Sequence, residues 1–265
     1  MGHVLLGTLP KSKRWREVVE LIAAGADAAQ VANATIKVAE LAFSYDRVNN
    51  DPGFNQAVWL MTQLGLAGSA ASPFQHLRGC GVDIPASTSV MGVMVAFTEA
   101  MERRLASSRI RSDLGDLAHR ALVDAVGHGL QAKIEGQLFN ATPEVIQNAL
   151  AEYRKPKEFA KLSRTFFSRL TRECLDYYLS RTLNSQLGEG QRFASTNEKS
   201  QFDEALATHC REASVIVEKY SAEWFDKHRH EEKGNISRES VQGFASWAMK
   251  KMTSELKAGA DPNAD

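Results

Sequence analysis

The chain has 265 residues, enough for one large helical domain or two small ones, and 43% of them are apolar while 24% are charged. Lysine plus arginine and aspartate plus glutamate number 32 each, so the formal net charge is zero. Such a chain has no overall field that would draw it onto nucleic acid or an anionic membrane, and any partner of that kind must be bound by a local patch.

The cysteines and the apolar runs indicate the cellular compartment in which the protein is expected. Cys80, Cys174 and Cys210 form an odd set without paired spacing, which suits a reducing environment. The first residues lack the basic lead of a signal peptide, and the longest apolar run elsewhere, residues 90–97, is too short to cross a bilayer. We therefore expect a soluble, cytoplasmic protein that binds no membrane.

Three helices are predicted within residues 1–64, and no apolar alternation indicates a β-strand. The second of them begins at Asp27 and carries apolar residues at helical spacing as far as Tyr45. An aspartate followed by proline is a strong start signal, because the carboxylate caps the first turn and proline fits it, so the third helix begins at Asp51. Gly65 is expected to end it.

Residues 65–85 concentrate glycine, serine and proline. They form the predicted mobile connection between the N-terminal segment and a helical bundle of residues 86–258. Within this bundle a helix after Ser112 contains two glycines, Gly127 and Gly129, which are expected to break or kink it. The last seven residues, 259–265, are predicted to be a disordered tail.

The longest stretch that reads as helix without an internal glycine or proline is residues 156–187. At 100° per residue, Phe159 and Phe166 fall on one side of it, and a row of cationic residues falls on the other. The first half should therefore be amphipathic, and the second half, apolar on most sides, should be surrounded by neighbours. Five cationic residues, which we call the basic face, are the candidate partner- or phosphate-binding residues: Lys157, Lys161, Arg164, Arg169 and Arg172.

The charge around the basic face is unbalanced. Residues 154–181 carry eight cations against three acidic residues, whereas the chain from Ser195 onward leans acidic. One interpretation is a solvated face that pairs partly with the acidic helix, and the other is a docking surface for phosphates or an acidic protein. The sequence favours the solvated face, because runs of charge usually lie in water, and for a docking surface it does not separate phosphates from an acidic protein as the partner.

A capping box that starts at Ser195 begins the next helix, whose apolar seam includes Leu206 and Ile216 and which Gly234 is expected to end. Because the loop before it is short, this helix is predicted to pack antiparallel to the central one. A last helix follows Ser237. The predicted fold class is therefore all-α, a multi-helix bundle with a long antiparallel helical hairpin in its C-terminal half.

Two groups of residues are candidates for chemistry. Asp124 and His128 are four residues apart on one helix and could share a metal, but His119 lies about half a turn away from them. Cys80 follows His76 by four residues, a spacing that permits a cysteine nucleophile without any third group that could be named. Phosphate-loop, serine-elbow and dinucleotide motifs are missing from the sequence. We expect no metal and no cofactor.

The predicted function is that of a non-enzymatic helical interaction protein, a subunit or adaptor of a bacterial multi-protein assembly, with phage-defence systems as one example. Its expected partners are other protein subunits. An alternative is a nucleic-acid-binding protein that uses the basic face. A second alternative is an enzyme with an unrecognised site around Cys80 and His76 or in residues 119–128.

Overall fold

The computed structural model describes residues 2–4, 13–39, 44–107, 110–134 and 141–258. Most of these residues belong to helices, which confirms the predicted all-α class. Two short strands in this part of the chain, β1 (Gly2–Val4) and β2 (Ile110–Ser112), pair in parallel. The tail predicted as disordered lies outside the described residues.

The N-terminal helices begin where the capping residues predict. The carboxylates of Asp27 and Asp51 each accept a hydrogen bond at 2.8 Å from the backbone N–H of the third residue after them. The second predicted helix ends at Val38, however, and Tyr45 begins a separate short helix. The helices of this part are α1 (Lys13–Ala23), α2 (Ala28–Val38), α3 (Tyr45–Asn50), α4 (Pro52–Ala67) and α5 (Pro73–Gly79).

Among the described residues from 90 onward, most belong to helices. The helices of this part are α6 (Val90–Ser107), α7 (Asp113–Lys133), α8 (Pro143–Ala151), the 3-10 helix η1 (Glu152–Arg154), α9 (Pro156–Ser185), α10 (Thr196–Ala213), α11 (Val215–Glu231) and α12 (Arg238–Ala258).

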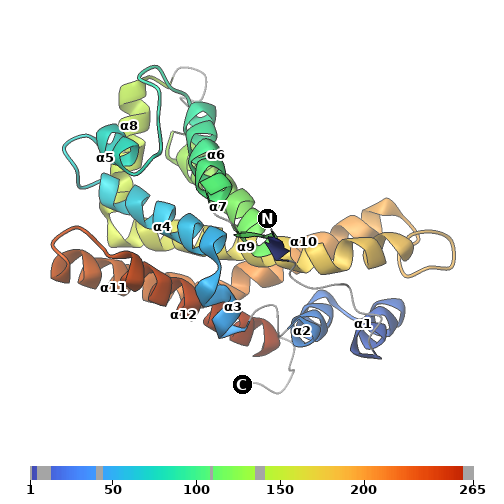
Figure 1. Cartoon of the computed structure of the whole chain (residues 1–265). Helices are drawn as coiled ribbons and strands as arrows, with labels where there is room; N and C mark the ends of the chain where they lie inside the picture. The colour runs from blue at the N-terminus through green and yellow to red at the C-terminus, as the bar shows by residue number, and fades with distance from the viewer. Residues whose placement is uncertain (1, 5–12, 40–43, 108–109, 135–140, 259–265) are drawn as a thin grey trace.

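The long helix α9 runs through the middle of the molecule (Figure 1). Helix α7 packs on one side of it, and after a loop the chain turns back so that α10 and then α11 pack along it. Helix α4 packs on α7 and α12, and α1 and α2 lie at the end near α10. One continuous core of buried apolar side chains extends from Trp15 to Leu256.

The first half of α9 is buried on one side, as the sequence predicts. In the first half, Phe159 and Phe166 are fully buried, and Phe159 stacks on Phe225 of α11 with ring centroids 4.2 Å apart. In the second half, three leucines on the side that is basic in the first half are buried too: Leu175, Leu179 and Leu183. Ser180, Arg181, Asn184 and Ser185 are exposed, however, so neighbours cover this half only in part and the prediction that they surround it is wrong.

The single helix predicted between Ser195 and Gly234 is instead two helices, α10 and α11, which meet at Ser214. The Ser214 side chain is buried, and its hydroxyl donates a hydrogen bond to the Arg211 carbonyl oxygen at 2.7 Å. A serine that bonds to nearby backbone competes with regular helix geometry, and this one marks the break. Past it, Val217 and Trp224 are buried while Ile216 is only half-buried, so the seam continues into α11 without Ile216 at its centre.

Gly65 does not end α4, which continues to Ala67. A Cβ atom at Gly65 would lie 2.9 Å from ring atoms of both Phe159 and Phe225. The glycine therefore serves a close approach of α4 to α9 and α11 and is not a stop signal.

Close packing also explains Gly127 and Gly129 of α7. Helix α7 passes through Gly127 and Gly129 without interruption, so a break there is wrong, while the alternative of a kink stays a prediction. A Cβ at Gly127 would lie 2.5 Å from the Met94 sulfur of α6. The missing side chain lets α6 and α7 pack closely.

The connection predicted at residues 65–85 contains α5 and several core residues. Leu77, Val82 and Ile84 are buried, and α5 packs on α4 and α8. The mobility of residues 65–85 and the division of the chain into two parts by this connection stay predictions.

We expect Leu206→Ala to lower the free energy of unfolding by about 2–5 kcal/mol, because it empties a fully buried position. Ile216 is only half-buried, so Ile216→Ala should lower the free energy of unfolding by less, about 1 kcal/mol. Urea melts measure both, with Gln201→Ala on the exposed side of α10 as the control. Equal effects at Leu206 and Gln201 would contradict the packing of α10.

Gly65→Ala should destabilise the protein by about 1–3 kcal/mol, because the added methyl group overlaps two aromatic rings. Gly243 is the matched control: it lies in the interior of α12 with no atom within 4 Å of an added Cβ. Gly243→Ala should therefore stabilise the protein by about 0.5–1 kcal/mol through helix propensity. Thermal melts of the two variants should move in opposite directions, and a shift of the same sign would refute the close approach at Gly65.

Candidate functional site

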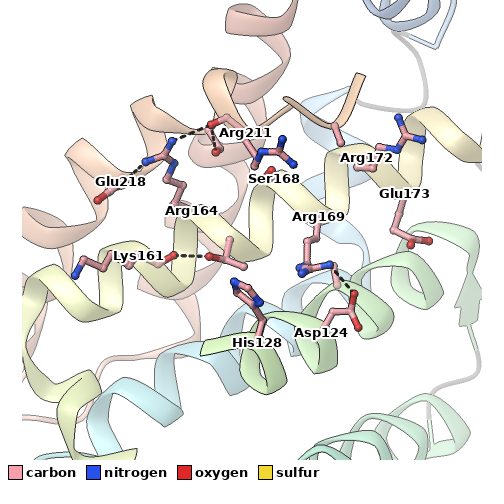
Figure 2. A pocket seen from close by; sticks show the side chains of 14 residues that line it. Asp124, His128, Lys161, Arg164, Ser168, Arg169, Arg172, Glu173, Arg211 and Glu218 are labelled. Carbon is pink, nitrogen blue, oxygen red and sulfur yellow. Dashed lines mark hydrogen bonds and ion pairs between the residues drawn. The ribbon is translucent and has the colours of Figure 1, made fainter. Parts of the chain in front are cut away.

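An open cleft of about 570 Å³ lies beside the polar side of α9, between α7 and the α10–α11 pair (Figure 2). We call it the α9 cleft. Five cationic and three acidic side chains line it together with small polar residues and one histidine: Lys161, Arg164, Arg169, Arg172, Arg211, Asp124, Glu173, Glu218, Thr165, Ser168, Ser214 and His128, with Ala121 and Ala207.

Most of the predicted basic face lies in this cleft. Four of its five residues line the cleft, and Lys157, which is exposed one turn before Lys161, does not. Asp124 and His128, which the sequence marked as a candidate metal pair, face them from α7 (Figure 2). The structure thus brings two separately proposed groups of residues to one place.

The basic face is not a row of unpaired charges. Arg164 donates to the Glu218 carboxylate at 2.7 Å, and its other Nη donates to the Arg211 carbonyl oxygen at 3.3 Å. Arg172, whose side chain is only 20% exposed, donates to Asp176 at 2.9 Å and to the Asp203 carbonyl oxygen at 2.9 Å. This is the pairing with the acidic C-terminal helices that one interpretation of the sequence expected.

Lys161, which lines the cleft, is paired with a carboxylate on its own helix. Its Nζ donates to Glu158 at 2.7 Å, and Lys133 of α7 donates to the same carboxylate. Burial would raise the pKa of Glu158, but the hydrogen bonds and charges of the two lysines hold it below its usual value. The hydrogen bond to Glu158 in turn raises the pKa of Lys161, which is 63% exposed and stays charged.

Arg169 has the most unused hydrogen-bonding capacity in the α9 cleft. Its Nη1 donates to Asp124 at 2.8 Å, and its other donors meet no partner among the described residues. More than half of the Asp124 side chain is exposed, so this ion pair contributes about 0–1 kcal/mol and is easily exchanged. Beside it the Ser168 hydroxyl also has no partner within the described part of the chain. Donors for an incoming anion are therefore present.

Asp124 and His128 have no further metal ligand beside them among the described residues. His119 does not line the cleft, and the charged residues nearest to it include Glu102 of α6. Across the described ranges, no three His, Cys, Asp or Glu side chains form a group that could hold a metal ion. Asp124 is engaged by Arg169 instead.

The Cys80 and His76 side chains meet on the same acceptor. The thiol of Cys80 lies 3.4 Å, and Nε2 of His76 lies 3.0 Å, from Oε1 of Gln63. The thiol therefore donates to an amide oxygen and not to the imidazole that would have to accept its proton. Burial raises the pKa of the Cys80 thiol, an effect that the charge of Arg238 partly offsets, and burial lowers the pKa of His76.

The residues that sequence reasoning missed come from distant segments. Arg211 and Glu218 complete the α9 cleft from the far side, and Gln63 supplies the group that joins Cys80 to His76. The acidic character of the chain after residue 195 was the signal for Glu218. No local pattern marks Gln63, because its role depends on the packing of α5 against α4.

A scan against models of known protein families, a search of curated proteins and a search of solved structures each find no match to this chain. Among the helices described, none combines the length and the apolar character that a membrane span requires.

Iodoacetamide should label Cys80 more slowly than it labels glutathione at neutral pH, because a raised pKa leaves less of the reactive thiolate. Mass spectrometry measures the rate, and Cys80→Ser identifies the signal. His76→Asn should leave the rate unchanged. Labelling faster than glutathione that slows in His76→Asn would instead support the cysteine nucleophile.

Proposed function

We propose that this chain is a protein-interaction module, a subunit or adaptor that binds an acidic segment of a partner protein in the α9 cleft. The observation that supports it is the excess of five cationic over three acidic side chains in one open cleft of a chain whose net charge is zero. Carboxylates of a partner would accept hydrogen bonds from the exposed Lys161 and from the unused donors of Arg169.

The cleft favours an acidic peptide over a nucleic acid. The affinity for nucleic acid grows with the number of phosphates that cations neutralise. Arg164 and Arg172 are already bound to groups on α10 and α11, so the row along α9 is interrupted. A peptide carboxylate needs only one or two donors and can exchange with Asp124 at Arg169.

The test uses a labelled peptide of alternating glutamate and glycine and an oligothymidylate of matched net charge. Lys161→Gln together with Arg169→Gln should weaken binding of the peptide about tenfold, a loss of ~1.4 kcal/mol, when measured by fluorescence anisotropy at physiological salt. The control removes the same charge from exposed positions of α9 outside the cleft, with Lys157→Gln and Arg181→Gln. It should change the affinity less than about twofold.

Tighter binding of the oligothymidylate than of the peptide would favour the nucleic-acid alternative. Equal losses in the cleft variant and the control variant would show a nonspecific charge effect. Either result would overturn the proposal.

A variant that is expected to bind the peptide more tightly strengthens the test. Asp124→Asn removes the carboxylate that occupies Arg169 in the unbound protein, so the acidic peptide should bind more tightly, by about threefold to fivefold if the pair contributes under 1 kcal/mol. The same anisotropy titration measures it. Weaker binding in this variant would mean that Asp124 itself contacts the ligand.

A further inference from the structure

A second pocket, of about 560 Å³, lies where α4 and α5 meet the start of α12. We call it the α5 pocket. The side chains that matter for its chemistry are Trp59, Gln63, His76, Cys80 and Arg238. Among the described residues that line it, none carries a carboxylate. In this respect it differs from the α9 cleft, whose cations are opposed by three acidic side chains.

Arg238 is held in place without a counter-charge. Its guanidinium stacks on the Trp59 ring at 3.8 Å from the centroid, and Nη1 donates to Oε1 of Gln56 at 3.1 Å. Within the described part of the chain it forms no ion pair with a carboxylate. Burial, and then the charge of nearby Arg104, lower its pKa, but an arginine stays protonated in a protein. The pocket therefore contains a positive charge with several unused N–H donors.

Gln63 supplies a second donor to the same pocket. The side chain is only 4% exposed, and its Oε1 faces the His76 ring and the Cys80 thiol. The Nε2 amide of Gln63, a residue that lines the pocket, donates to no partner among the described residues. It is not one of the buried polar atoms that lack a partner, so it is accessible and its hydrogens are available to an oxygen ligand in the pocket.

We propose that the α5 pocket is a binding site for a small carboxylate, which accepts hydrogen bonds from the Arg238 guanidinium and from the Gln63 amide. The planar guanidinium matches a carboxylate in geometry, and stacking on Trp59 keeps its donor edge oriented. Arg238 contributes the one fixed positive charge among the described residues that line the pocket. A monoanion balances that charge, whereas a phosphate dianion would leave one negative charge uncompensated.

The site is independent of the α9 cleft, since none of its lining residues is shared with it. Its failure would therefore leave the proposed protein-interaction function untouched.

The experiment is a titration of the full chain with acetate, with benzoate and with inorganic phosphate at constant ionic strength. Nitrogen–proton NMR follows the Trp59 indole and the Gln63 side-chain amide. We expect saturable shifts of both signals with the carboxylates. Arg238→Gln should weaken binding about tenfold or more, as the loss of a charge-assisted pair predicts.

Two further variants make the outcome decisive. Arg104→Gln removes an equal charge near the pocket but not from its lining, and it should change the affinity less than about twofold. Gln63→Glu keeps an oxygen acceptor for His76 and Cys80 but replaces the amide donor with a negative charge, so it should abolish binding. Thermal melts confirm that both variants fold.

Three results would overturn the proposal. The first is the absence of saturable shifts with either carboxylate. The second is an equal loss in the Arg104 and Arg238 variants, which would indicate a nonspecific cationic surface. The third is tighter binding of phosphate than of benzoate, which would assign the pocket to a different class of anion.

Discussion

The structure depends on a cluster of aromatic rings that joins the first half of α9 to α11 and α12. Phe159 stacks on Phe225 with ring centroids 4.2 Å apart, and Trp224 stacks on Phe244 with centroids 4.3 Å apart. Phe167 meets Phe244 edge to face at 6.0 Å. Such ring pairs contribute about 0.5–1.5 kcal/mol each beyond the burial of their area. Helix α4 approaches the same cluster closely because it has no side chain where it touches the rings.

This cluster decides which side of α9 remains for function. Once the aromatic side faces α11 and α12, the opposite side must face α7 and the junction of α10 with α11. Ion pairs such as Arg164–Glu218 line that side, and pairs that are partly exposed contribute about 0–1 kcal/mol. The rings therefore hold the helices together, while the charged residues determine what the cleft can bind.

The two pockets have nearly equal volumes but different electrostatics. In the α9 cleft, each of the five cations already has an acidic partner, so a ligand must exchange with a carboxylate such as Asp124. In the α5 pocket, Arg238 lies beside an aromatic ring and an amide, and a ligand would not have to displace a carboxylate of the lining. The first arrangement suits a partner that binds through several exchangeable contacts. The second suits one small anion with a fixed orientation.

The sequence by itself determined the all-α class, most helix starts and the buried side of α9. These features depend on neighbours within a few residues: the capping carboxylates of Asp27 and Asp51 bond to their own first turn, and apolar residues at helical spacing share a face. The four predicted cationic residues of the cleft were also found in this way.

Only the tertiary structure decided how these residues are used. A glycine in a sequence can end a helix or admit a neighbouring one, and Gly65 is of the second kind because Phe159 and Phe225 lie against it. Arg164 can be free or paired, and it is paired because packing brings Glu218 to within 2.7 Å from 54 residues away. Local spacing contains no information on such contacts, since they depend on which helices the apolar faces bring together.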